Sequence, residues 1–136
     1  MNILFLGDSI TEGNLGVSYV DMVKEKKQDW ITDNRGIGGD TVSSLYRRVK
    51  KMNDLATFDQ IILFIGVNDV FGKLTLPYKI AKVLRRQKWA KNNMVFKNQY
   101  LELMECLYSQ NKNIIIIPPL LLGENYTNKW NQEITS

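Results

Sequence analysis

The sequence predicts an α/β fold in which strands and helices alternate around a parallel β-sheet. Short, continuous apolar runs such as Ile61–Ile65 and Ile114–Ile117 are typical of strands that are covered on both faces. Between such runs lie longer segments with an apolar residue every three or four positions, as βαβ units with right-handed crossovers require. No repeat, linker or low-complexity tract interrupts this pattern, so we expect a single domain over residues 1–136.

The first half of this alternation has three elements. Ile3–Leu6 is a short apolar run and is expected to be the first strand. Valines at spacing three from Val17 to Val23, in a polar stretch that ends at Lys27, predict the first helix. Trp30–Asp33 is expected to be a short second strand.

The second half continues in the same way. Apolar residues at helical spacing from Val42 to Leu55, with Thr41 as a helix N-cap, predict the next helix. Ile61–Ile65 is the third strand, and apolar residues from Phe96 to Tyr108 mark a further helix. Ile114–Ile117 is the last strand, which the two prolines after it end.

Composition narrows the classes of protein to consider. The chain has one cysteine, Cys106, and therefore no internal disulfide. The apolar run at the N-terminus stops at Asp8, which is too short for a signal peptide, and no stretch approaches the length of a membrane span. We expect a cytoplasmic protein. The chain contains no histidine, the residue that normally exchanges protons in serine and cysteine hydrolases.

The positive charge is unevenly distributed. The segment from Val70 to Leu101 has eight basic residues and no acidic one. A solvated helix face is the ordinary interpretation, while an anionic ligand, a membrane surface or nucleic acid are the alternatives. Within this segment Pro77–Trp89 is expected to form an amphipathic helix that could cover a nearby site as a lid.

Three polar clusters directly follow the first three predicted strands. They are Gly7–Thr11 with Ser9, the glycine-rich stretch Asn34–Thr41, and Gly66–Asp69 with Asn68. Because ligands of open parallel sheets bind beyond the carboxyl ends of the strands, we expect the clusters to meet at one edge. A serine, a glycine N–H and an asparagine amide at one point are the groups that acyl transfer requires.

Each cluster also has an ordinary structural interpretation. Gly7, Asp8 and Ser9 are common in turns, and Asn68 with Asp69 could simply close a strand. The glycine-rich stretch could be a helix entry, or its N–H groups could bind an anion at the helix N-terminus. Their order after three successive strands favours the catalytic interpretation.

The three clusters resemble blocks I, II and III of the SGNH (GDSL-type) hydrolase family, and the resemblance extends from Met1 to about Gly123. It implies a flavodoxin-like, three-layer α/β/α sandwich and hydrolysis of carboxylic esters or thioesters without a metal or organic cofactor. It also implies that Ser9 is the nucleophile. Gly39 would donate its backbone N–H to the oxyanion, Asn68 its side-chain amide, and Ser9 its own N–H.

The chain departs from the family pattern in one respect. The fourth block, Asp-x-x-His, supplies the general base after a fifth strand, and neither histidine nor block is present in these 136 residues. We expect a domain that is incomplete at its C-terminus and has little or no activity on its own. Asp8 and Asp69 are near the predicted site, but a carboxylate of ordinary pKa is a poor base toward a serine hydroxyl.

Two hypotheses about function remain at this point. The first is a serine ester hydrolase acting on a small-molecule ester, with no nucleic-acid partner. The second is a non-catalytic module that holds an anionic ligand through the glycine-rich stretch and the basic segment. In either case the apolar strand Ile114–Ile117 is expected to be covered by a second chain, by swapped elements or by residues 120–136.

Overall fold

The computed structural model describes residues 1–14, 16–74 and 90–119, and for residues 71–74 the backbone alone. In this part of the chain the elements follow the order β1 (Asn2–Gly7), α1 (Ser9–Glu12), α2 (Tyr19–Lys26), β2 (Ile31–Gly36), α3 (Val42–Val49), the 3₁₀ helix η1 (Leu55–Thr57), β3 (Gln60–Phe64), α4 (Val67–Leu74), α6 (Asn93–Tyr108) and β4 (Ile114–Ile117).

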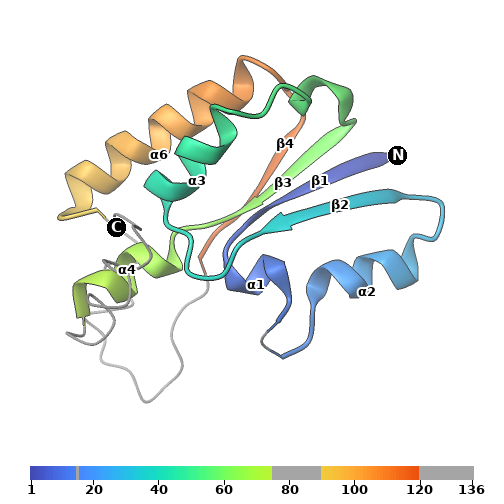
Figure 1. The fold of residues 1–136 in the computed structure, drawn as a ribbon, viewed down its shortest axis with the longest axis horizontal. Helices are drawn as coiled ribbons and strands as arrows, with labels where there is room; N and C mark the ends of the chain where they lie inside the picture. The colour runs from blue at the N-terminus through green and yellow to red at the C-terminus, as the bar shows by residue number, and fades with distance from the viewer. Residues whose placement is uncertain (15, 75–89, 120–136) are drawn as a thin grey trace.

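The described strands form one parallel sheet in the order β2-β1-β3-β4. Strand β1 lies between its two partners, with Leu6 opposite Arg35 of β2 and opposite Leu63 of β3. Helices α3 and α6 lie on one face of this sheet, and α1 and α2 lie toward the other (Figure 1). The α/β fold predicted from the sequence is therefore confirmed, with the strand order of a flavodoxin-like sheet.

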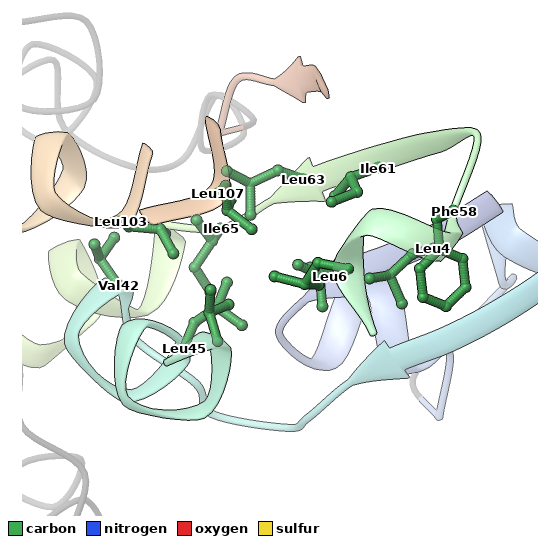
Figure 2. Packing of buried hydrophobic residues seen from close by; sticks show 12 residues of the cluster. Leu4, Leu6, Val42, Leu45, Phe58, Ile61, Leu63, Ile65, Leu103 and Leu107 are labelled. Carbon is green, nitrogen blue, oxygen red and sulfur yellow. The ribbon is translucent and has the colours of Figure 1, made fainter. Parts of the chain in front are cut away.

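The hydrophobic core is divided unequally between the two faces of the sheet. The face toward α2 has a small cluster built on Ile3, Phe5 and Val20. The face toward α3 and α6 has a much larger one, whose side chains from strands and helices point into one interior (Figure 2). Its fully buried members include Leu4, Leu6, Leu45, Leu55, Ile61, Leu63, Ile65, Leu103 and Leu107. Among the described residues, most of the apolar burial therefore lies on the α3 and α6 side.

Besides shifts of one to three residues at other ends, the differences from the sequence predictions include two boundaries and one additional helix. Strand β2 continues to Gly36 instead of ending at Asp33, because its register with β1 extends as far as the pair Gly7 and Gly36. Helix α3 ends at Val49, and the apolar Leu55 beyond it reaches the core from η1. The short helix α1 follows β1 directly and was not expected.

Some predictions fall on residues that the structure does not describe. The predicted lid at residues 77–89 lies wholly outside the described residues, and so do five of the eight basic residues of the basic segment. Residues 120–136, one of the expected covers for the last strand, lie outside them too. Among the described residues, no helix combines the length and the apolar character needed to cross a membrane.

Candidate active site

Ser9 lies directly after β1, as the first residue of α1. The buried Asp8 is the N-cap of this helix, and its Oδ1 accepts a hydrogen bond from the Ile10 N–H at 3.0 Å. A side chain at Gly7 would overlap both the carbonyl oxygen of Phe64 and the hydroxyl of Thr11. Glycine is therefore required at the end of β1, where the chain turns tightly and leaves Ser9 half-buried at the edge of the sheet.

The glycine loop, residues 36–39, connects β2 to the start of α3 and lies beside Ser9. A Cβ added at Gly38 would be 3.9 Å from the Ser9 Cβ and 2.8 Å from Oε2 of Glu12. The next residue, Gly39, has a φ of +80°, a left-handed conformation that favours glycine. The end of β1 also holds the loop, because the Ile37 N–H donates to the Gly7 carbonyl at 3.1 Å.

Asn68 lies in the first turn of α4, one residue after the helix begins, and its side chain is buried. Its Nδ2 donates to the backbone carbonyl of Asp40 at 3.0 Å. Asp40 directly follows the glycine loop. The loop therefore connects the two other predicted site residues, with Gly38 beside Ser9 and Asp40 bonded to Asn68. Gly39, the predicted backbone donor, lies between these two points of contact.

Asp69 accepts hydrogen bonds through its side chain from two backbone N–H groups, one of them at the start of α3. Its side chain is only 1% exposed, and its Oδ2 accepts the Val42 N–H at 2.9 Å. Its Oδ1 accepts the Ala90 N–H at 3.2 Å. The Thr41 hydroxyl accepts the Ser44 N–H at 3.3 Å, which confirms Thr41 as the N-cap. Two of the N-terminal N–H groups of α3 are thus bonded to side chains of the protein.

Two arginines that sequence reasoning did not single out hold the polypeptide on either side of the glycine loop. Arg48, on α3, donates from Nε and Nη2 to Oδ2 of Asp40, at 2.9 and 2.6 Å. Arg35, on β2, is paired with the carboxylates of Asp33 and Asp54. The hydrogen bonds and charge of Arg35 hold the pKa of Asp54 below its usual value.

A cavity of about 790 Å³ lies on the α6 side of Asp69. Gly66 and Asp69, on either side of Asn68, form one part of its lining, and the first half of α6 forms another. Its apolar lining residues are Val70, Met94, Phe96, Tyr100, Leu101, Ile116, Pro118 and Pro119. Burial raises the pKa of the Tyr100 phenol. The volume is within the roughly 300–1,000 Å³ of small-molecule sites.

The structure brings the three predicted clusters to one edge of the sheet, because β1 and β3 are adjacent and parallel. This is the arrangement expected for a site that stabilises an oxyanion beside a serine. The catalytic roles of Ser9, Gly39 and Asn68 stay predictions. Asp40 and Asp69 belong to the predicted clusters, but the sequence does not indicate which groups they bind.

Comparison with known proteins supports the same interpretation. A family model for GDSL-like lipases and acylhydrolases matches residues 5–135. The chain belongs to this family. It is 27% identical over 145 aligned residues to an acetylxylan esterase from Geobacillus stearothermophilus. That alignment covers 90% of this chain and 61% of the esterase, so the chain spans less than two thirds of this relative's length.

Solved structures similar to this fold include further esterases. An acetyl xylan esterase aligns with a TM-score of 0.76 at 24% identity, over 99% of this chain and 67% of the other. The acetylxylan esterase of Geobacillus stearothermophilus aligns with the same score at 22% identity, over 98% of this chain and 66% of its own. Its solved forms include catalytic mutants in which a serine, an aspartate or a histidine is replaced by alanine.

Proposed function

We propose that this chain carries the nucleophile and the oxyanion hole of a serine ester hydrolase. In this proposal Ser9 attacks the ester carbonyl, and the Gly39 N–H and the Asn68 amide stabilise the oxyanion, with the Ser9 N–H as a third donor. The observation that carries the proposal is the position of the glycine loop, which lies beside Ser9 at Gly38 and is followed by Asp40, whose carbonyl accepts a hydrogen bond from Asn68. Membership of a family of lipases and acylhydrolases supports it.

The chemistry follows from these groups. The Ser9 Oγ adds to the carbonyl carbon of a carboxylic ester or thioester, and a base takes the hydroxyl proton. The intermediate collapses to an acyl-serine, and the alcohol or thiol leaves with a proton. Water then cleaves the acyl-serine and releases the acid. The cavity beside Gly66 and Asp69 is large enough for the apolar part of a small ester, but Ser9, Gly39 and Asn68 are not among the residues that line it.

No histidine is present in the 136 residues to act as the base for this reaction. Asp69 already accepts two backbone N–H groups. Asp8 caps α1 through its Oδ1. We therefore propose that these residues alone acylate Ser9 slowly, and that an imidazole from outside them is needed for rapid turnover. The acyl transfer itself requires no metal or organic cofactor.

Acetyl transfer from p-nitrophenyl acetate to Ser9 tests the proposal. An acetyl ester is the first substrate to try, because the relatives are named as acetylxylan esterases. We expect slow release of p-nitrophenolate that added imidazole accelerates, together with a mass increase of one acetyl group on the Ser9 peptide. An oxyanion hole that acts without its base gives roughly a thousand- to ten-thousandfold over water. Asn68→Ala should reduce the protein-dependent rate to near background, since one oxyanion donor contributes roughly a hundredfold or more.

Matched variants separate this result from nonspecific acetylation. Ser9→Ala in the same imidazole buffer gives the rate that the buffer alone produces. Ser109→Ala, which alters an exposed serine at the end of α6, should behave like the unaltered chain. Equal rates for Ser9→Ala and the unaltered chain would refute the nucleophile. Rapid turnover without imidazole that depends on Ser9 would show that another residue of this chain is the base.

A non-catalytic module that holds an anion remains the alternative function. Its basic segment contributes Lys91 and Lys97, both exposed, to the described part of the chain. Lys97 also lies at the lining of the cavity. Binding of an anionic ligand that is unaffected by Ser9→Ala, in a chain that never acylates, would favour this alternative.

A further inference from the structure

The side chain of Arg48 binds the residues on both sides of the glycine loop. Arg48 makes three donations from a single guanidinium group. Two go to the carboxylate of Asp40, directly after the loop, and the third goes from Nη1 to the backbone carbonyl of Arg35, directly before it, at 3.1 Å. A planar guanidinium presents its donors in a fixed fork, so these contacts fix the separation of the two loop ends.

Asp40 connects Arg48 to the predicted oxyanion donors, since Asp40 accepts from Asn68 and directly follows Gly39. Its carboxylate accepts from Arg48 at 2.6 Å in an ion pair whose acidic side chain is 5% exposed. Its carbonyl accepts from the Asn68 amide, and its N–H donates to the Ile37 carbonyl at 3.0 Å. A shift of Asp40 therefore shifts the side chain of Asn68 and the backbone of Gly39 together.

We propose that Arg48 is a positioning residue for the oxyanion hole, acting through Asp40. The inference rests on the proposed function of the site. Arg48 keeps the Gly39 N–H and the Asn68 amide aimed at one point and does not touch the reacting atoms itself. Helix α3 is a suitable platform for it, because its inward face is buried in the core through Leu45 and Val49.

The test compares Arg48→Gln with Lys51→Gln, an exposed lysine just beyond the last turn of the same helix. Both variants remove one positive charge from the C-terminal end of α3, so their effects on the helix dipole are matched. Three quantities are measured on the whole chain: the unfolding temperature, the NMR signals of the Asn68 carboxamide and the Gly39 amide, and the rate of Ser9 acylation by p-nitrophenyl acetate.

We expect Arg48→Gln to move both NMR signals and to slow acylation by about a hundredfold, the loss that a misplacement of roughly 1 Å can cause. Lys51→Gln should leave the signals and the rate unchanged. If Arg48→Gln does not fold, Arg48→Lys replaces it, because a single ammonium cannot form all three contacts and should displace the same signals less.

The outcomes separate the two proposals. A folded Arg48→Gln chain with unmoved Asn68 and Gly39 signals would overturn the positioning role, whatever happens to its unfolding temperature. If the signals move in Arg48→Gln, the positioning role is supported. If Ser9 is acylated neither in the unaltered chain nor in the variant, the proposed hydrolase is overturned even though the positioning role stands.

Discussion

Arg35 illustrates how single residues hold the polar edge of this sheet. Its guanidinium binds Asp33 on its own strand and, through two nitrogens at 2.6 and 3.1 Å, Asp54 before η1. The same group lies over the Phe58 ring, 5.4 Å from its centroid. One arginine thus ties β2 to the connection between α3 and β3, while its backbone carbonyl accepts from Arg48.

The Arg35 pair makes stability depend on pH. The folded pKa of Asp54 lies below its unfolded value, chiefly through its hydrogen bonds with Arg35. Its contribution is complete above the ordinary aspartate pKa of about 3.9 and is lost as the pH falls through the lower folded value. We expect Asp54→Asn to reduce the free energy of unfolding by at most about 1 kcal/mol near neutral pH, because the pair is solvent-accessible.

Urea unfolding of the unaltered chain and of Asp54→Asn, repeated from about pH 7 down to about pH 3, checks this expectation. The difference between the two should shrink at the acidic end. Asp29→Asn, at an exposed position in the turn before β2, serves as the control. A difference that grows as the pH falls would contradict the sign of the Asp54 contribution.

Helix α6 has a buried and an exposed face. The Asn92 side chain caps it by accepting the Val95 N–H at 2.9 Å. Leu103 is fully buried in the larger core cluster, while Leu101, two positions earlier, is 51% exposed. The two leucines therefore form a matched pair for measuring how firmly α6 is packed on the sheet.

We expect Leu103→Ala to lower the free energy of unfolding by about 2–5 kcal/mol, through lost burial and a cavity that neighbours fill only in part. Leu101→Ala should change it by no more than about 0.5 kcal/mol. Chemical denaturation of the two variants measures both quantities. Equal losses would mean that α6 packs on the sheet through a different face.

The strand Ile114–Ile117 was predicted with the bounds that the structure has, because a continuous run of β-branched residues stopped by two prolines is typical of a strand. The predicted end of β2 was wrong because its residues are polar and are held by pairing with β1, a contact that the local pattern does not encode. The positions of Ser9 and Asn68 followed from strand order. The contacts of Arg48 could not be predicted, because they depend on the orientation of its side chain on α3 relative to the glycine loop.

At the scale of the whole molecule, β4 is the end strand of the described sheet and pairs there with β3 alone. Ile115 is 46% exposed and Ile116 is 43% exposed, on opposite faces of the strand. An apolar edge strand of this kind is a template for further pairing. We propose that β4 pairs with the β4 of a second copy, which would extend the sheet across a two-fold axis.

Light scattering after size exclusion tests this pairing. The mass should rise above the 15.8 kDa of one chain as the concentration increases. Ile115→Lys should keep the protein monomeric, because a charge on the edge opposes strand pairing. Ile31→Lys, an exposed isoleucine on the opposite edge strand β2, is the control and should not alter the mass. A chain that is monomeric at every concentration would rule the pairing out.

The side chain of Asp69 already occupies a hydrogen-bonding position at the start of α3. The N-terminus of a helix carries a partial positive charge of about half an elementary charge, and here the Val42 N–H donates to the Asp69 carboxyl group and not to a ligand. The Asp40 carboxylate is likewise balanced by Arg48. A dianion would therefore find the Val42 N–H group already bonded, whereas a neutral ester does not need it. Inorganic phosphate should accordingly compete only weakly with p-nitrophenyl acetate, as we expect of a site that favours groups whose charge develops during the reaction.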